Sequence, residues 1–166
     1  MHYRYIATPI GQLLLAGDEQ GLRAIGFPQG KGRINPGARW QQQDDCFAAA
    51  ETQLREYFDG KRRSFDLLLA PAGTEFQRAV LTALQTIPFG ETRSYADIAR
   101  QIGRPAAVRA VGAANGRNPL PIVLPCHRVI GADGSLTGFG GGLATKLFLL
   151  RLEGIELQEG SQGKLF

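Results

Sequence analysis

Apolar residues come in short runs at the beginning of the chain. The runs cover residues 3–8, 13–16 and 22–27, with Gly11, Gly17 and Gly21 between them. Short runs at this spacing, bounded by glycine, predict the strands of a small antiparallel sheet. The stretch over residues 28–37 is rich in proline and glycine and predicts a mobile loop.

The apolar positions then change to helical spacing. Four of them predict a helix over residues 45–59, which Gly60 ends: Phe47, Ala50, Leu54 and Phe58. A strand-like run over residues 65–69 follows, and the Pro-Ala-Gly segment at 71–73 has the composition of a linker. We therefore expect an N-terminal unit of residues 1–70 and a second unit of residues 71–166.

The second unit has a mostly helical pattern, which makes the chain an α+β protein. Thr74 and Gln77 have the spacing of a capping box, and the helix that they open is expected to end at Pro88-Phe89-Gly90. Ser94 is predicted to cap a short helix over residues 95–102, and Pro105 to open another that runs to about Asn115. Two short helices joined by a tight turn have the proportions of a helix-turn-helix, although such pairs also occur in proteins that bind no nucleic acid.

The second of these short helices, residues 106–115, consists almost entirely of small residues and carries one arginine, Arg109. Tight packing in the core is one interpretation of this composition. Close approach to a narrow groove is the other, because the minor groove of DNA excludes bulky side chains. The residues alone leave both interpretations open.

Composition and charge narrow the class of protein. The chain of 166 residues is 43% hydrophobic and 20% charged, as is ordinary for a globular protein. It has no apolar run of the ~18 residues that a membrane span needs, and the first residues lack the core of a secretory signal. Together with two cysteines in no disulfide pattern, this predicts a cytoplasmic protein that contacts no membrane. Cys46 is interpreted as a small buried hydrophobe. The chain has only two histidines and no closely spaced cysteine pair, so no metal site is expected.

The distribution of the charge points to a partner. The net charge is +4, and between Arg93 and Arg128 there are six arginines, no lysine and one acid, Asp97. Arginine favours forked contacts to phosphate and stacking on bases. The bias therefore indicates nucleic acid as the partner.

Cys126, followed directly by His127, is the candidate nucleophile. A free thiol has a pKa near ~8.5, so it needs a nearby base or positive charge to react at neutral pH. His127 can supply the base through a turn or a bridging water, and Glu153 can orient the imidazole. Taken singly, each residue has an ordinary structural interpretation: a buried cysteine, or a solvated acid at the end of a leucine-rich helix. A helix C-terminus disfavours a carboxylate, however, so Glu153 is expected to have a tertiary partner.

Several motifs in order resemble one family. The segments at 109–115 (RAVGAAN), 118–119 (NP), 121–122 (PI), 125–129 (PCHRV) and 149–154 (LLRLEG) are similar to those of the O6-alkylguanine-DNA alkyltransferases, also called methylated-DNA–protein-cysteine methyltransferases. The resemblance covers residues 74–154, and the N-terminal part is similar only in size and strand content. It implies a ribonuclease H-like N-terminal unit and a C-terminal helical unit with a winged-helix-like helix-turn-helix.

The resemblance also implies an activity. The alkyl group on O6 of guanine, with O4-alkylthymine as a further candidate, moves irreversibly and once per molecule to Cys126 after the base has been flipped out of the duplex. The implied partner is double-stranded DNA bound through its minor groove. No cofactor is implied, and the protein is expected to act as a monomer, with cooperative binding on DNA left open.

Residue roles follow from the same resemblance. Cys126, a water, His127 and Glu153 form the relay, Asn118 holds the turn before the active-site strand, and Tyr95 presses on the 3′ phosphate and donates to guanine N3. Arg109 enters the base stack. Further DNA contacts are expected from Ser94, Ala110, Gly112, Ala113, Arg117 and Arg128. The substrate pocket is expected to include Pro121, Val129, Phe139 and Gly140, with Phe139 where family members often have tyrosine.

Two other functions compete with this interpretation. One is a relative that binds alkylguanine without repairing it, although relatives of that type lack the reactive cysteine that is present here. The other is a cysteine hydrolase, which needs an oxyanion hole and regenerates its thiol. Persistence or loss of the group on Cys126 distinguishes transferase from hydrolase.

Overall fold

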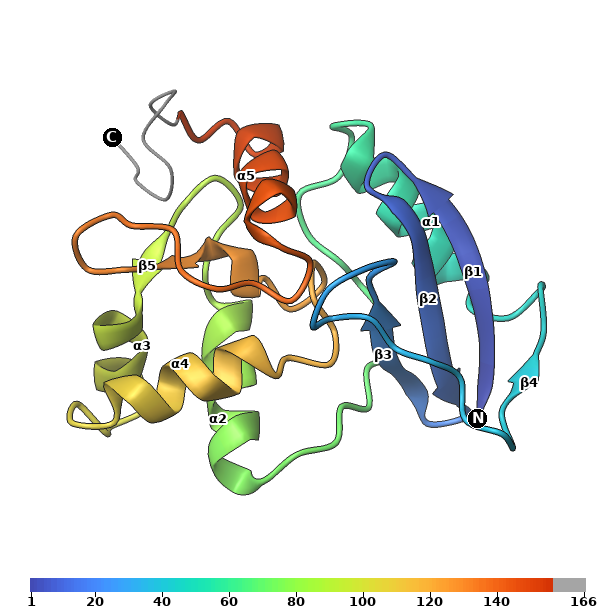
Figure 1. The fold of residues 1–166 in the computed structure, drawn as a ribbon, viewed down its shortest axis with the longest axis horizontal. Helices are drawn as coiled ribbons and strands as arrows, with labels where there is room; N and C mark the ends of the chain where they lie inside the picture. Colours follow the sequence, from blue (N-terminus) through green and yellow to red (C-terminus); the bar gives the residue numbers. More distant parts are fainter. Residues whose placement is uncertain (157–166) are drawn as a thin grey trace.

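A small sheet forms the N-terminal half of the computed structural model, which describes residues 1–156 (Figure 1). Strands β1 (His2–Thr8), β2 (Gly11–Asp18) and β3 (Gly21–Gly26) pair antiparallel, which confirms the three predicted strands. The short β4 (Gln41–Gln42) pairs parallel to β1, so the order is β3-β2-β1-β4. Its two glutamines carry no apolar pattern, and β4 was therefore not predicted.

Helix α1 (Ala48–Phe58) covers one face of this sheet (Figure 1). It buries Ala50, Leu54 and Tyr57. The helix begins three residues later than predicted, because Phe47 is in the left-handed conformation with φ 57°. The interpretation of Cys46 as a buried hydrophobe is wrong, since the residue is only half-buried and its thiol donates to the Gln43 carbonyl at 2.9 Å.

The predicted strand over residues 65–69 does not form. Only Leu69 bridges to the sheet, through Leu22. The Leu22 N–H donates to the Leu68 carbonyl at 2.9 Å, and the Ala70 N–H donates to the Leu22 carbonyl at 2.8 Å. The segment is thus an extended connection along β3 that leads into the C-terminal half.

Helices α2 (Glu75–Gln85), α3 (Tyr95–Gln101), α4 (Val108–Gly116) and α5 (Leu143–Leu152) make up most of the C-terminal half, with two short parallel strands, β5 (Arg93–Ser94) and β6 (Val129–Ile130). Capping boxes at Thr74 and Ser94 confirm the predicted starts of α2 and α3. Helix α2 ends at Gln85, before the predicted Pro88 stop. Helix α4 begins at Val108 rather than at Pro105, because residues 104–107 form a turn in which the Ala107 N–H donates to the Arg104 carbonyl at 2.9 Å.

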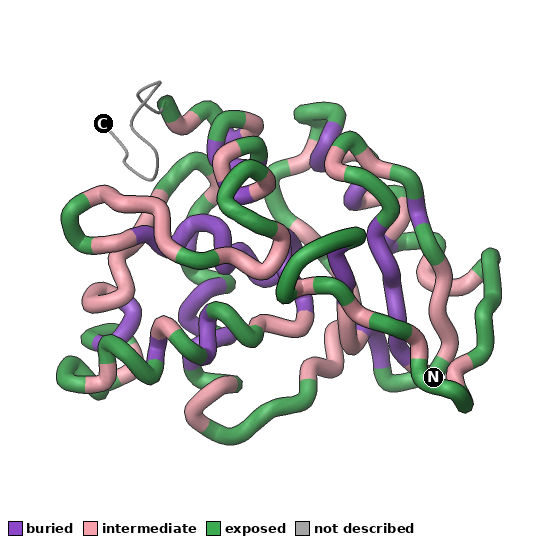
Figure 2. Tube along the Cα trace, viewed as in Figure 1, coloured by how far each residue is buried: buried purple, intermediate pink, exposed green. Residues whose placement is uncertain are grey.

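Buried residues line the boundary between the two halves, as Figure 2 shows, and those of both halves belong to one hydrophobic cluster. Helix α4 contributes Val111, Ala114 and Asn115 to the interior. Its opposite face, with Arg109, Ala110 and Ala113, is exposed. The small residues of α4 therefore serve tight packing on one side and leave a low surface on the other. No helix within residues 1–156 is long and apolar enough to cross a membrane.

Candidate active site

A tight turn braced by Asn118 carries Cys126. The side chain of Asn118 accepts from the Leu120 N–H at 2.9 Å and donates to the Leu124 carbonyl at 2.7 Å. The Cys126 N–H donates to the same Leu124 carbonyl at 2.7 Å. Within the turn, Ile122 has φ 75°, a strained conformation for a β-branched residue. Asn118 thus spans the turn and holds the backbone that presents the thiol.

The expectation that Cys126 lies on an extended strand is wrong. Cys126 begins a short 3-10 helix, Cys126–Arg128, that leads into β6. Because successive residues of this helix do not alternate between opposite faces, His127 and Arg128 both turn toward the end of α5. There they meet Glu153, the residue that caps α5.

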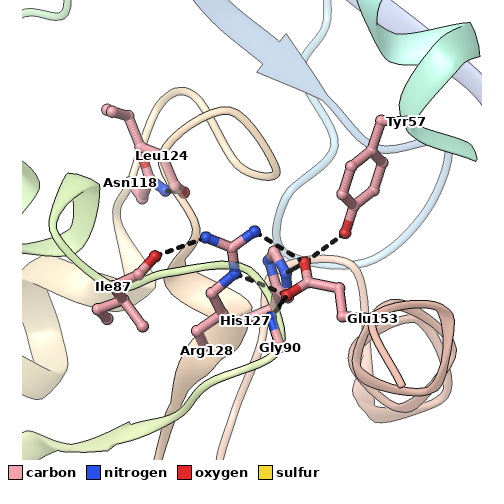
Figure 3. Close-up of polar contacts among 8 residues, drawn as sticks. All are labelled: Tyr57, Ile87, Gly90, Asn118, Leu124, His127, Arg128 and Glu153. Carbon is pink, nitrogen blue, oxygen red and sulfur yellow. Dashed lines mark hydrogen bonds and ion pairs between the residues drawn. The ribbon is translucent and has the colours of Figure 1, made fainter. Parts of the chain in front are cut away.

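The Glu153 carboxylate is the centre of a buried hydrogen-bond network (Figure 3). Its Oε2 accepts from His127 Nε2 at 2.6 Å, from Tyr57 Oη at 2.6 Å and from Arg128 Nη2 at 3.0 Å. Its Oε1 accepts from Arg128 Nε at 2.7 Å and from the Gly90 N–H at 3.0 Å. These partners satisfy both oxygens of a carboxylate that the helix C-terminus alone would disfavour.

The network sets the charge states of its members. Burial raises the pKa of Glu153, but the hydrogen bonds from His127 and Arg128 and the positive charge of Arg128 outweigh it and hold the pKa well below its usual value. Burial lowers the pKa of His127 below its usual value, against the pull of Glu153. With Nε2 donating to Glu153, a neutral His127 presents Nδ1 as an acceptor. This Nδ1 is buried and has no hydrogen-bond partner among the described residues.

The Cys126 thiol lies near a buried lysine. Cys126 is 4% exposed, and burial raises its pKa to about 11, opposed by hydrogen bonding from Asn118 and by the charge of Lys146. Lys146 is wholly buried, and its Nζ donates to the Val129 carbonyl at 2.7 Å. Burial lowers the pKa of Lys146 to about 8. A positive charge at this position favours the thiolate over the thiol.

A cavity of about 280 Å³ opens onto Cys126. Asn118, Pro121, Phe139 and Gly140 line it, as do residues of the N-terminal half, among them Phe27 and Gly32. A neighbouring cavity of about 690 Å³ shares the loop over residues 138–140 and is lined further by Tyr95, Val108 and Gly112. Among residues 1–156, no group of three His, Cys, Asp or Glu side chains is placed to hold a metal ion.

The loop after β3 forms part of the cavity wall. The Gly32 N–H donates to the Gly140 carbonyl at 2.8 Å, and the rings of Phe27 and Phe139 meet edge to face with centroids 5.4 Å apart. A Cβ on Gly32 would lie 2.9 Å from the Gly140 carbonyl carbon, so only glycine allows this approach. The predicted loop over residues 28–37 is thereby joined to the active-site loop.

Some of the predicted DNA-contacting residues are exposed, and others make contacts within the protein. Arg109, Ala110, Ala113 and Arg117 are exposed on α4 or at its end, and Gly112 faces the ring of Tyr95. The Tyr95 hydroxyl is hydrogen-bonded to Thr137. The Ser94 side chain is used within the protein, since its Oγ accepts from the Asp97 N–H at 3.0 Å and caps α3.

Two predicted roles are corrected by the structure. Arg128 is not a DNA contact, because it is buried, forms a two-fold ion pair with Glu153 and donates to the Ile87 carbonyl at 2.7 Å (Figure 3). Val129 is wholly buried and is not among the residues that line either cavity. It supports the site from behind, through the carbonyl that accepts from Lys146.

Sequence reasoning missed Tyr57, Gly90 and Lys146. Tyr57 lies 96 positions before Glu153, and no local pattern connects the two. Lys146 left a signal, because it precedes Leu149 and Leu150 by three and four residues and so belongs to the apolar face of α5. A lysine on such a face indicates a buried, functional or paired charge.

Two family models match the chain. The model described as 6-O-methylguanine DNA methyltransferase, ribonuclease-like domain, matches residues 1–71. The model described as 6-O-methylguanine DNA methyltransferase, DNA binding domain, matches residues 75–155.

Individual proteins agree with these matches. The chain is 54% identical to a methylated-DNA–protein-cysteine methyltransferase of Methanosarcina acetivorans, over 93% of this chain and 99% of that protein. The crystal structure of Mycobacterium tuberculosis OGT in complex with DNA is 50% identical, with a TM-score of 0.88 and 93% of each chain covered. Schizosaccharomyces pombe Atl1 in complex with damaged DNA containing O6-carboxymethylguanine is 33% identical, with a TM-score of 0.50, and covers 57% of this chain and 92% of its own.

Proposed function

Because this chain belongs to the 6-O-methylguanine DNA methyltransferase family, we propose that Cys126 is the residue on which its reaction takes place. The protein repairs alkylated DNA by direct reversal, moving the alkyl group from O6 of guanine to its own cysteine. The observation that carries the assignment is the position of Cys126 at a cavity beside the His127–Glu153 pair. Cys46 has no such surroundings, as its thiol only caps a turn.

The relay removes the thiol proton. Glu153 holds His127 through Nε2, so that Nδ1 can take the proton from Cys126 through a water molecule. The sulfur then attacks the alkyl carbon, the S–C bond forms, and the C–O6 bond breaks as its electron pair returns to the guanine. The guanine anion regains neutrality by accepting one proton, and His127 gives up the proton that it took from Cys126, so the thiol proton is in effect transferred to the guanine. Lys146 favours the thiolate while it forms.

The product explains why each molecule acts once. An S-alkylcysteine is a thioether, with no carbonyl or phosphoryl centre that water could attack. No step of the relay removes the alkyl group from the sulfur, so the thiol is not regenerated. Transfer is therefore stoichiometric and irreversible.

The guanine must leave the duplex to reach Cys126, since the thiol lies on a buried turn. We assign to Arg109 the place that the base leaves in the stack, because Arg109 is exposed on α4. The small exposed residues Ala110 and Ala113, with Gly112, let α4 approach the minor groove closely. Arg117, at the end of α4, is proposed to contact a phosphate.

Tyr95 and Phe139 are proposed to receive the flipped base together with Pro121 and Gly140. Burial raises the pKa of Tyr95, so its hydroxyl keeps the proton that it would donate to guanine N3. The Phe139 ring can stack on the base but offers no hydroxyl. The backbone around Gly140 leaves room for the alkyl group.

Three further expectations belong to the proposal. The chain divides into units of residues 1–70 and 71–166, although residues 157–166 lie outside the described residues. The protein works in the cytoplasm. It binds double-stranded DNA as a monomer.

Intact-protein mass tests the assignment directly. The protein is incubated with a duplex that contains one O6-methylguanine, and peptide mapping locates the adduct. We expect one methyl-for-hydrogen exchange per molecule, on Cys126, with the Cys46→Ala control reacting normally. Cys126→Ala should gain no mass and still bind the damaged duplex.

Other outcomes identify the competing functions. Binding of the duplex by the wild-type protein without any gain in mass would establish a damage-binding protein. A Cys126 adduct that disappears with time would establish a turnover enzyme. Loss of damaged-DNA binding in a folded Cys126→Ala variant would contradict the assigned role of Cys126.

A further inference from the structure

We propose that Tyr57 of the N-terminal half is a positioning residue for the alkyl-transfer relay: its hydroxyl fixes the Glu153 carboxylate and draws off part of its charge, which keeps His127 neutral. The inference rests on the proposed function of Cys126, His127 and Glu153. It gives helix α1, which lies outside the helical half, a part in the chemistry.

The contact geometry is direct. Tyr57 Oη donates to Glu153 Oε2 at 2.6 Å, and His127 Nε2 donates to the same oxygen at 2.6 Å (Figure 3). Tyr57 is wholly buried, so no water competes for its hydroxyl. Tyr57 and His127 therefore share one acceptor atom in a dry environment, where hydrogen bonds have their largest effect.

Packing aims the hydroxyl at the carboxylate. The Tyr57 ring meets Phe58, Phe65 and Phe89 with centroids 5.5, 5.6 and 6.2 Å away. Phe89 in turn has the guanidinium of Arg63 5.2 Å and that of Arg128 5.8 Å from its ring centroid. The ring is thus clamped by residues of both halves, and the hydroxyl cannot leave Glu153 without disturbing this cluster.

The hydroxyl acts as a permanent donor. Burial and the neighbouring Glu153 charge raise the pKa of Tyr57 far above its usual range. A phenol that keeps its proton lowers the basicity of the oxygen to which it donates. An Oε2 of lower basicity stabilises an imidazolium less, so His127 remains a neutral base.

Other charges around the relay act with Tyr57 or against it. Arg128 and Lys146 both lower the pKa of His127, whereas Glu153 raises it. Cys126 interacts with Lys146. Tyr57 is uncharged and alters the relay through a single hydrogen bond, so one substitution can separate its effect from those of the charges.

The discriminating experiment is the pH dependence of single-turnover methyl transfer in Tyr57→Phe, with Phe58→Leu as the matched control. Phe58→Leu perturbs the same aromatic cluster but removes no partner of Glu153. In Tyr57→Phe, we expect the acid limb of the rate profile to move up by about one pH unit, the equivalent of one hydrogen bond. At pH values below that limb, Tyr57→Phe should react about tenfold more slowly than wild type. Its rate on the plateau at higher pH and its binding of damaged DNA should stay near wild type.

Two additions keep the test decisive. The two histidines of the chain allow the pKa of His127 to be followed by NMR without DNA, with a His2→Gln variant for assignment. Difluorotyrosine at position 57 keeps the ring and strengthens the donor, so it should shift the acid limb down. This variant answers the question even where Tyr57→Phe does not fold.

The outcomes separate the inference from the function on which it rests. Equal acid limbs in wild type, Tyr57→Phe and the difluorotyrosine protein, with only thermal stability changed, would overturn the positioning role. A shift of the same size in Phe58→Leu would overturn it as well. Failure of the wild-type protein to take up any methyl group would instead contradict the proposed function.

Discussion

Glu153 links the stability of the fold to its chemistry at the level of a single side chain. Its carboxylate accepts from Arg128, His127 and Tyr57, and the ion pair with Arg128 requires the ionised form. A neutral glutamine would leave Arg128 buried beside an uncharged partner, which is costly in proteins. The residue proposed to orient His127 therefore also links helix α1 of the N-terminal half to the C-terminal half.

A pH dependence of stability follows from this side chain. The folded pKa of Glu153 is about 2, against an ordinary value of 4.5. A depressed folded pKa contributes stability that is fully present above pH 4.5 and is lost as the pH falls toward 2. The contribution is about 3 kcal/mol at neutral pH. Urea unfolding from pH 6 down to pH 3 should therefore show a loss that Glu153→Gln lacks.

The matched control is Glu91→Gln, which removes an exposed carboxylate at the surface. It should keep the acid-dependent loss of stability at the wild-type size. An identical pH dependence in Glu153→Gln and wild type would mean that folding does not shift the pKa of Glu153.

The residues also mark where sequence reasoning reached and where it did not. The Cys126–His127–Glu153 set was found from motifs that lie close in the sequence. Arg128 was assigned to DNA because composition counts a charge without its burial. The role of Tyr57 could not be predicted, because its contact with Glu153 joins residues 96 positions apart and depends on tertiary packing.

Among the elements, α4 uses small residues on two different faces, and its composition alone could not distinguish the two. Val111 and Ala114 lie on the face that packs into the core, and Arg109 and Ala113 lie on the exposed face. Helix starts with local capping, such as those at Thr74 and Ser94, were predictable because a cap involves neighbours in the sequence. The 3-10 helix at Cys126 and the two-residue strands were not, because tertiary contacts rather than periodicity form them.

Arg109→Ala tests the exposed face of α4. We expect repair of O6-methylguanine in a duplex to slow by about tenfold or more, since flipping costs a few kcal/mol and the arginine offsets part of it. Repair of the same lesion in a single strand should change little, because no stack has to be filled. Single-turnover rates on the two substrates measure the difference.

Arg55→Ala provides the charge-matched control, as Arg55 lies on α1 and pairs with Glu51. Both of its rates should stay near wild type. Equal slowing of duplex and single-strand repair in Arg109→Ala would argue for a general role in binding and against the stacking role.

For the whole molecule, the positive charge is divided between surface and interior. Arg117 is exposed at the end of α4, whereas Arg128 forms an ion pair with Glu153 in the interior. Only exposed arginines can release counterions from DNA. A sequence-based charge map of residues 93–128 therefore overstates the DNA-facing charge.

The salt dependence of affinity distinguishes the two arginines. In a Cys126→Ala background, which prevents consumption of the substrate, Arg117→Ala should reduce the slope of log affinity against log salt by about 0.9. Arg128→Gln, which also removes a charge, should leave the slope unchanged and lower the melting temperature. A reduced slope in Arg128→Gln with an unchanged melting temperature would restore Arg128 as a phosphate contact.

The burial of Cys126 also affects how long the protein stays unreacted before it meets damaged DNA. A protein that reacts only once must avoid reaction with the many other electrophiles of a living cell. The thiol is 4% exposed, behind a cavity of about 280 Å³ whose walls come from both halves of the chain. A thiol this deeply buried also keeps its proton, because burial raises its pKa to about 11, and a protonated thiol reacts slowly with electrophiles that arrive without DNA.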